Sequence, residues 1–169
     1  ISTLKKTHME LGGKSAFIVR HDADIGGAVQ AGLTGFVTHC GQGCALTTRH
    51  IVHNAIRPHY VAAMQQAVAQ IKVGNPGDPS VMMGPLIREN ARQRVEHFVQ
   101  SALDSGAKLM AGGKRPTDLV KGFYFEPTFF DDVDNQSKLA QEEAFGPVAA
   151  VIGFDTDEEA IELANDSDF

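Results

Sequence analysis

The sequence predicts a layered α/β fold, in which a sheet of buried strands is covered by helices. Short apolar runs typical of strands alternate along the chain with longer segments of helical periodicity. Glycine, proline and asparagine separate these segments, as is typical of turns. The 169 residues, 43% of them apolar, suffice for one compact domain or for part of a larger one.

The strands are expected at short apolar runs, whose length is typical of strands rather than helices. They are residues 15–20, 50–52, 108–111, 128–131 and 148–154. Loops are expected at residues 75–79, which read Asn-Pro-Gly-Asp-Pro, and at the glycine pair 112–113.

Helices are expected between and after these strands. The first begins after Asp24, a residue type that caps helices, and runs to about Val37. The second spans residues 57–72, the third spans residues 88–105 and stops at Gly106, and the last spans residues 157–164. Their apolar residues at helical spacing are expected to face the core: Val61, Met64, Val68 and Ile71 in the second helix, and Val95, Phe98, Val99, Ala102 and Leu103 in the third.

Charge and composition argue against several classes of function. A net charge of −6 and a pI near 5.6 disfavour a nucleic-acid partner, because phosphate binding requires a basic face. No apolar run approaches the ~18 residues of a membrane span, and the N-terminus lacks a secretory signal pattern. Cys40 and Cys44 could close only a very small loop, so no disulfide framework is expected. A reduced, cytoplasmic location is predicted.

Cys44 is the most informative residue of the chain. It lies in the run FVTHCGQGCALTTR at residues 36–49. Cysteine is the strongest nucleophile that side chains offer at neutral pH, and it suits attack on a carbonyl carbon. Gly41 and Gly43 lack a Cβ, so they permit a tight turn and close approach of a substrate to the backbone. Upstream, Glu10 in the run MELGGKS is a candidate general base.

Other chemistries fail on spacing. The run GGKS at residues 12–15 imitates the end of a phosphate-binding loop, but the required first glycine would fall on His8. No metal site is expected, because His50 and His53 point to opposite faces of an expected strand and lack zinc-ligand spacing with the cysteines. The remaining histidines outside the motifs are expected on the surface: His21, His59 and His97.

Three separated motifs occur in order along the chain. They are ELGGKS at residues 10–15, GQGC at residues 41–44 with Arg49 five residues later, and EEAFGPV at residues 142–148. Weaker matches in the same register lie at residues 73–76, 83–86, 122–128 and 159–165. With these motifs the chain resembles the aldehyde dehydrogenase superfamily over nearly its whole length.

The resemblance implies a three-layer α/β/α catalytic domain that is incomplete at both ends. Residues 1–12 would be the tail end of the dinucleotide-binding domain, and residues 13–169 would be the catalytic domain, truncated at its C-terminus. The Gly-rich dinucleotide-binding half of the family would precede this chain, and an oligomerisation strand would follow it. The full-length protein is expected to be a homo-oligomer, either a dimer or a tetramer.

The resemblance also implies roles for four residues. Cys44 would be the nucleophile and Glu10 the general base, while Glu143 would bind the ribose hydroxyls of the nicotinamide nucleotide and Phe145 would pack near the nicotinamide. The implied reaction is the oxidation of a small-molecule aldehyde to a carboxylic acid with NAD or NADP. It would proceed through a thiohemiacetal and a thioester on Cys44, which Glu10 would help water to hydrolyse. One departure is His39, where many members carry asparagine.

Two alternatives remain open. A cysteine hydrolase or acyl transferase would pair Cys44 with a histidine base such as His39 and would not need Glu143. Alternatively, the chain by itself is a folding or assembly module without catalytic competence. Because it lacks the Gly-rich helix N-terminus that holds the pyrophosphate, we expect the isolated chain to bind no dinucleotide measurably.

Overall fold

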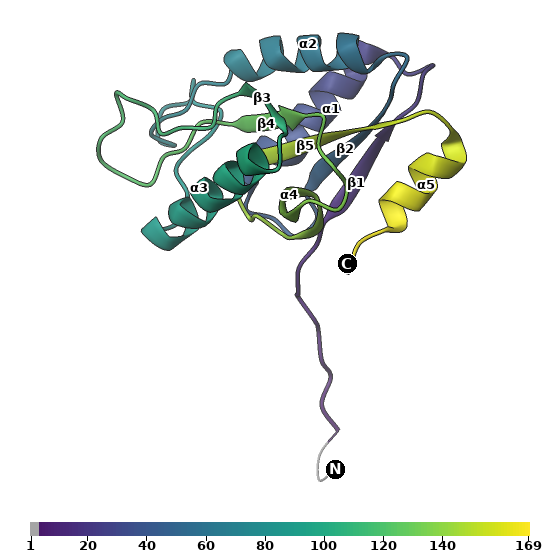
Figure 1. Cartoon of the computed structure of the whole chain (residues 1–169). Coiled ribbons are helices and arrows are strands. Elements are labelled where there is room, and N and C mark those ends of the chain that lie inside the picture. The colour runs from purple at the N-terminus through teal and green to yellow at the C-terminus, as the bar shows by residue number, and fades with distance from the viewer. Residues whose placement is uncertain (1–3) are drawn as a thin grey trace.

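One sheet forms the centre of the protein. The structure is a computed structural model that describes residues 4–169. Within these residues, five strands lie in the order β1-β2-β5-β4-β3 (Figure 1). They are β1 (Ser15–Val19), β2 (Thr47–His53), β3 (Lys108–Ala111), β4 (Thr128–Asp131) and β5 (Val148–Phe154). The neighbours β1, β2, β5 and β4 are parallel, and β3 is antiparallel to β4.

Helices cover both faces of this sheet. On one face lie α1 (Ile25–Val37) and α2 (Arg57–Ala69), and on the other lie α3 (Glu89–Asp104), α4 (Lys138–Gln141) and α5 (Asp157–Asn165) (Figure 1). The central strand β5 is almost completely buried, as a parallel strand between two helical layers should be. The α/β fold class predicted from the sequence is confirmed.

The helix ends follow the capping signals in the sequence. The carboxylate of Asp24 caps α1 by accepting a hydrogen bond from the backbone N–H of Gly27 at 2.8 Å. Beyond α3, Gly106 has a φ of 88°, and its N–H donates to the carbonyl oxygen of Leu103. Both predicted ends are confirmed. The side chain of Leu103, however, is 42% exposed and not in the core as predicted, because it lies beside the apolar stripe of α3 rather than within it.

Two boundaries differ from the prediction by three residues, and the others that differ do so by one. β2 begins at Thr47 rather than at His50, because residues 47–49 pair with β1 although their polar side chains conceal a strand pattern. α2 ends at Ala69 rather than at residue 72, since the chain leaves the helix before Val73 pairs with Met83 in an isolated bridge.

Two short elements were not predicted. The 3₁₀ turn η1 (Thr38–Gly41) follows α1 directly, and α4 is a single turn capped by Ser137. Elements of this length are too short to produce an apolar periodicity that a sequence reading can detect.

Candidate active site

The three motifs meet at one edge of the sheet. Gly13, Cys44 and Gly146 lie just before β1, β2 and β5, which are three neighbouring parallel strands. Since the amino ends of parallel strands share an edge, the strand order by itself gathers these residues. Most open α/β sheets instead bind ligands at the carboxyl ends of their strands.

Two glycines allow the motifs to touch. A Cβ on Gly13 would lie 2.1 Å from the carbonyl oxygen of Cys44, which joins the first motif to the second. A Cβ on Gly41 would lie 2.1 Å from the backbone of Gly146, which joins the second motif to the third. Gly41 also has a φ of 70°, in the left-handed region that favours glycine. A side chain at either position would force these segments apart.

The carboxylate of Glu143 lies against Gly13 and its neighbour Gly12. The backbone N–H of Gly13 donates to its Oε1 at 3.2 Å, and a Cβ on Gly12 would lie 3.0 Å from its Oε2. Arg94 of α3 holds the segment from the other side by donating to the carbonyl oxygen of Glu143. The predicted cofactor residue and the predicted nucleophile Cys44 therefore share the support of Gly13.

The environments of the two cysteines differ as predicted. Cys44 is exposed and lines a cavity of about 270 Å³ together with Gly12, Gly13 and Phe169. Cys40 is buried, and burial raises the pKa of its thiol to about 12. Of the two thiols, only Cys44 is accessible to a substrate.

Phe145 and Glu143 line a larger neighbouring cavity. Its volume is about 690 Å³, and Gln42, Ile87 and Arg94 contribute to its walls. The ring of Phe145 is 42% exposed, and its φ of 53° is unusual for an aromatic residue. An exposed aromatic ring beside a carboxylate is not part of the core.

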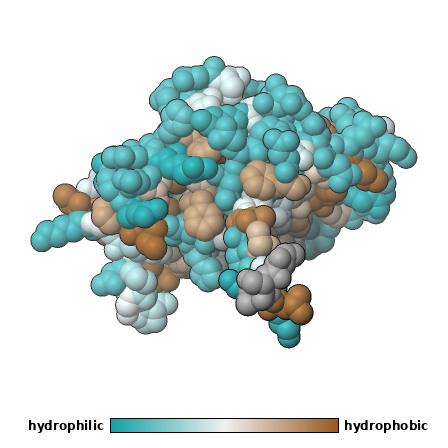
Figure 2. Space-filling view, turned by 90° about the horizontal axis from the view of Figure 1, so that it is seen from below, coloured by the Kyte–Doolittle hydropathy of each residue, from teal (hydrophilic) through white to brown (hydrophobic). Residues whose placement is uncertain are grey.

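Figure 2 shows the face from which the N-terminal segment leaves, with apolar side chains interspersed among hydrophilic ones.

Glu10 is not brought to Cys44. It lies on a segment without helix or strand that runs away from the body of the protein before β1 (Figure 1), and its exposed carboxylate contacts His8. Residues 1–3 of the predicted interdomain segment 1–12 lie outside the described residues.

The described histidine rings make no hydrogen bond to the candidate nucleophile. Within residues 4–169, no histidine ring forms a hydrogen bond with Cys44. The ring of His50 is buried, its Nδ1 lies 2.9 Å from the hydroxyl of Tyr60, and burial lowers its pKa to about 4. His39 is exposed with a φ of 51°. The three histidines predicted on the surface are confirmed there: His21, His59 and His97.

Sequence reasoning missed two buried cations beside the site. Arg49 was noted only as part of a motif, yet its guanidinium donates to the carbonyl oxygens of Lys14 at 3.0 Å, Leu163 at 2.9 Å and Ala164 at 2.8 Å. It thereby ties the beginning of β1 to the end of α5. Lys14 is 3% exposed, although it follows two glycines in a segment that reads as a loop. A polar residue in such a segment gives no sequence signal of burial.

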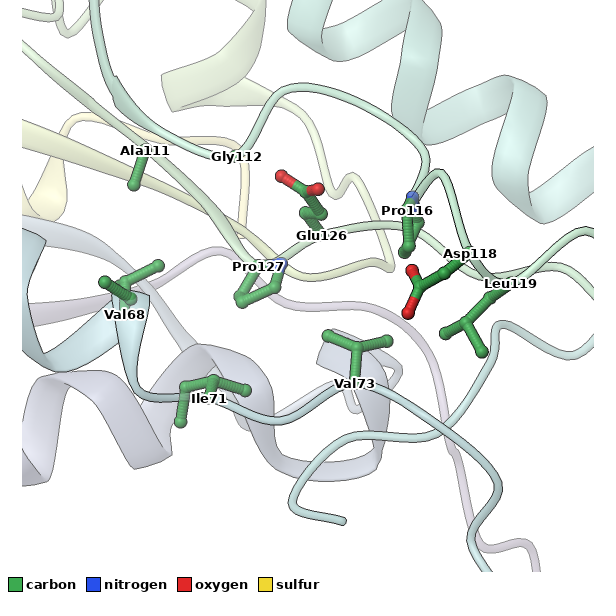
Figure 3. A pocket seen from close by; sticks show the side chains of 11 residues that line it. Val68, Ile71, Val73, Ala111, Gly112, Pro116, Asp118, Leu119, Glu126 and Pro127 are labelled. Atoms are coloured by element: carbon green, nitrogen blue, oxygen red, sulfur yellow. The ribbon is translucent and has the colours of Figure 1, made fainter.

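A separate cavity of about 420 Å³ lies between the end of α2 and the connection from β3 to β4 (Figure 3). Val68, Ile71 and Val73 form its apolar wall, and Asp118 and Glu126 supply carboxylates. None of the predicted site residues lines it.

Among residues 4–169, no helix has the length and apolarity needed to cross a membrane, and no group of three or more His, Cys, Asp or Glu residues could hold a metal ion.

Comparison with known proteins agrees with the motifs. The model of the aldehyde dehydrogenase family matches residues 1–169. A 3,6-anhydro-alpha-L-galactose dehydrogenase of Vibrio sp. strain EJY3 is 42% identical over 99% of this chain, which covers 35% of that protein.

Solved structures agree in fold as well. A betaine aldehyde dehydrogenase of Staphylococcus aureus in complex with NAD⁺ superposes with a TM-score of 0.91 at 43% identity, over 94% of this chain and 32% of its own. An aldehyde dehydrogenase of Mycobacterium tuberculosis complexed with NAD⁺ has a TM-score of 0.91 at 46% identity, over 94% and 33%. The chain thus spans about a third of the length of these relatives. The motifs, their convergence at one sheet edge and these matches agree. The chain therefore belongs to the aldehyde dehydrogenase family.

Proposed function

We propose that this chain is the nucleophile-bearing part of an NAD-dependent aldehyde dehydrogenase, which oxidises an aldehyde to a carboxylic acid. The observation that carries the proposal is the contact of Gly13 with both Cys44 and Glu143. A nucleophile and a hydroxyl-binding carboxylate on one backbone support are what this reaction requires of the catalytic half of the site.

Cys44 forms the covalent intermediates. Its sulfur adds to the aldehyde carbon, and the backbone N–H of Cys44 donates to the oxyanion that develops there. The accessible thiol and the cavity of about 270 Å³ beside it support this role. Loss of one such donor typically costs about 10²- to 10³-fold in rate.

Glu143 and Phe145 would hold the nicotinamide end of the cofactor. Only Gly13 donates to the side chain of Glu143 within residues 4–169, so its carboxylate keeps free acceptor positions for two ribose hydroxyls. The exposed ring of Phe145 offers an apolar surface in the same cavity. These residues fit the cofactor, which when bound accepts the hydride from the substrate carbon. The NAD⁺ complexes of the two structural relatives support NAD as the cofactor.

Glu10 would activate the water that hydrolyses the thioester. It lies three residues before Gly13, so an extended chain places it at most ~10 Å from the backbone that contacts Cys44. A small rearrangement of the exposed segment would bring the carboxylate into range. Both thiols are free, which fits the reducing cytoplasmic location that we propose for the full-length homo-oligomer.

The test uses a matched pair of cysteine variants of the full-length protein. Cys44→Ser should abolish the formation of NADH from NAD⁺ and an aldehyde, whereas Cys40→Ser, four residues away, should retain it. Retention of activity by Cys44→Ser would refute the proposal. If the parent forms no NADH but cleaves an activated ester in a Cys44-dependent way, a cysteine hydrolase or acyl transferase becomes the better assignment.

A further inference from the structure

The side chain of Lys14 is a buried cation for which packing alone gives no reason. Its side chain is 3% exposed, and its Nζ has no hydrogen-bond partner among the described residues. An ammonium group in this situation is costly unless other charges compensate for the loss of water. Replacement by an apolar residue would remove this cost, so the cation is an expensive choice for packing alone.

The charges around Lys14 come from three neighbouring parts of the fold. Arg49 on β2 and Arg94 on α3 repel the ammonium, while Glu142 and Glu143, before β5, attract it. Burial is the largest influence and lowers the pKa of Lys14 to about 7. The attraction of the two glutamates opposes this shift.

The backbone fixes Lys14 relative to Glu143. Arg49 donates to the carbonyl oxygen of Lys14 at 3.0 Å and is itself bound to the end of α5. On the preceding residue, the N–H of Gly13 donates to Glu143 at 3.2 Å. The backbone of Lys14 therefore follows directly after the residue that holds the carboxylate of Glu143.

We propose that Lys14 is a positioning residue whose buried ammonium group acts as the counter-charge that holds the Glu143 carboxylate against Gly13, in the orientation that binds the cofactor ribose. This inference rests on the proposed function of Glu143 and adds that the charge of Lys14 sets the orientation of its carboxylate. Because the pKa of Lys14 lies near neutrality, the counter-charge is present at pH 6 and largely lost at pH 8.5. Glu142 is exposed, and its Oε2 lies 3.9 Å from the Nζ of Lys138. Its carboxylate therefore depends less on the charge of Lys14 than the carboxylate of Glu143 does.

The first experiment measures the dissociation constant of NAD⁺ by calorimetry on the full-length protein at pH 6 and pH 8.5. For the parent, the dissociation constant of NAD⁺ should be at least about fivefold higher at pH 8.5 than at pH 6. Lys14→Met should bind NAD⁺ weakly at both pH values. Lys14→Arg, which stays charged, should lose the pH dependence while keeping the tighter binding. Lys108→Met changes an exposed lysine on β3 and should behave like the parent. In kinetics, Lys14→Met should raise KM for NAD⁺ more than it lowers kcat.

Glu143→Gln separates failure of this inference from failure of the proposed function. If Glu143→Gln leaves NAD⁺ affinity unchanged, the assigned role of Glu143 is wrong. If Glu143→Gln weakens binding while Lys14→Met retains the parental affinity and pH dependence, only the role of Lys14 is overturned.

A second measurement does not depend on the cofactor. Lysine labelled with ¹³C at the ε-carbon reports the ionisation of Lys14 by NMR, with the Lys14→Met spectrum assigning the signal. The pKa of Lys14 should fall in Glu143→Gln and change less in Glu142→Gln, because Glu143 is the stronger of the two attracting charges. An unchanged pKa in Glu143→Gln would overturn the inference.

Discussion

At the residue scale, the two cysteines show how strongly position changes the chemistry of one side chain. Cys40 is the last residue before the glycine that contacts Gly146, and it is buried, whereas Cys44 is exposed on the following loop. Four residues of chain thus separate an inert thiol from an accessible one. The sequence predicted this difference from the glycines around Cys44 and from the tendency of free cysteine to be buried.

We expect an alkylating agent such as iodoacetamide to modify Cys44 at least about tenfold faster than Cys40 in the folded full-length protein. Access favours Cys44, and the raised pKa of Cys40 leaves almost none of its thiolate near pH 8. Peptide mapping by mass spectrometry over time gives both rates. Equal rates, or faster labelling of Cys40, would contradict the assignment of the nucleophile.

His39 has a backbone conformation that both histidine and asparagine can adopt. Its φ of 51° lies in the left-handed region, where asparagine is enriched and β-branched residues are strongly disfavoured. His39→Asn should therefore be neutral or slightly stabilising, and His39→Val should lose about 1–2 kcal/mol of unfolding free energy. Urea denaturation of the three proteins tests this. Because the side chain is exposed, similar losses in both variants would show that backbone conformation is not the cause.

Replacement of Glu10 separates the two halves of the proposed reaction, which are the formation and the hydrolysis of the thioester. In the full-length protein, Glu10→Gln should slow thioester hydrolysis by about 10²-fold or more while thioester formation survives. Stopped-flow absorbance should record a burst of NADH close to one equivalent per site, followed by a stall. Steady turnover at the parental rate would show that another group is the base.

At the scale of elements, most of the fold could be predicted, and the errors have physical causes. Three strands have the predicted bounds, because each is a short apolar run between turn residues. Capping placed the ends of α1 and α3 correctly. The beginning of β2 and the end of α2 were misplaced, since long-range pairing decides both, and pairing partners are not encoded in a local pattern.

The contact between η1 and the segment before β5 predicts a difference between two left-handed glycines. Gly41→Ala would place its Cβ 2.1 Å from Gly146, whereas Gly106→Ala, with a φ of 88°, meets nothing within 4 Å. Both variants lose about 1 kcal/mol through backbone strain. Gly41→Ala should lose about 1–3 kcal/mol more through overpacking. Equal midpoints in urea would show that the two segments separate easily.

At the scale of the whole molecule, the site could be predicted in part. Three candidate members, Cys44, Glu143 and Phe145, were proposed from motifs, and the structure gathers them at one edge. Glu10 was proposed too, but its segment does not pack on the described domain. Lys14 and the anchoring role of Arg49 were not identified, because burial of a cation depends on strands that are distant in sequence.

We expect the isolated 169-residue chain to bind neither NAD nor NADP measurably and to self-associate. In the proposed site Glu143 and Phe145 would bind only the nicotinamide end of the dinucleotide. β1 is an edge strand that carries the exposed Ile18, next to the exposed Ile161 of α5. Calorimetric titration and light scattering after gel filtration test the two parts. Ile18→Lys should reduce association, since a charge on an edge strand blocks pairing. Micromolar affinity for either dinucleotide would contradict the expectation.

The contact between Gly13 and Glu143 joins positions 130 residues apart, so the site closes a long loop of the chain. Closing such a loop has a high entropic cost, and contacts of this kind form late in folding. During synthesis, the Cys44 loop leaves the ribosome long before β5 exists to complete its surroundings. We therefore expect the thiol to acquire its final environment only in the last stage of folding, so that any nascent chain stalled before residue 143 carries an unsheltered nucleophile.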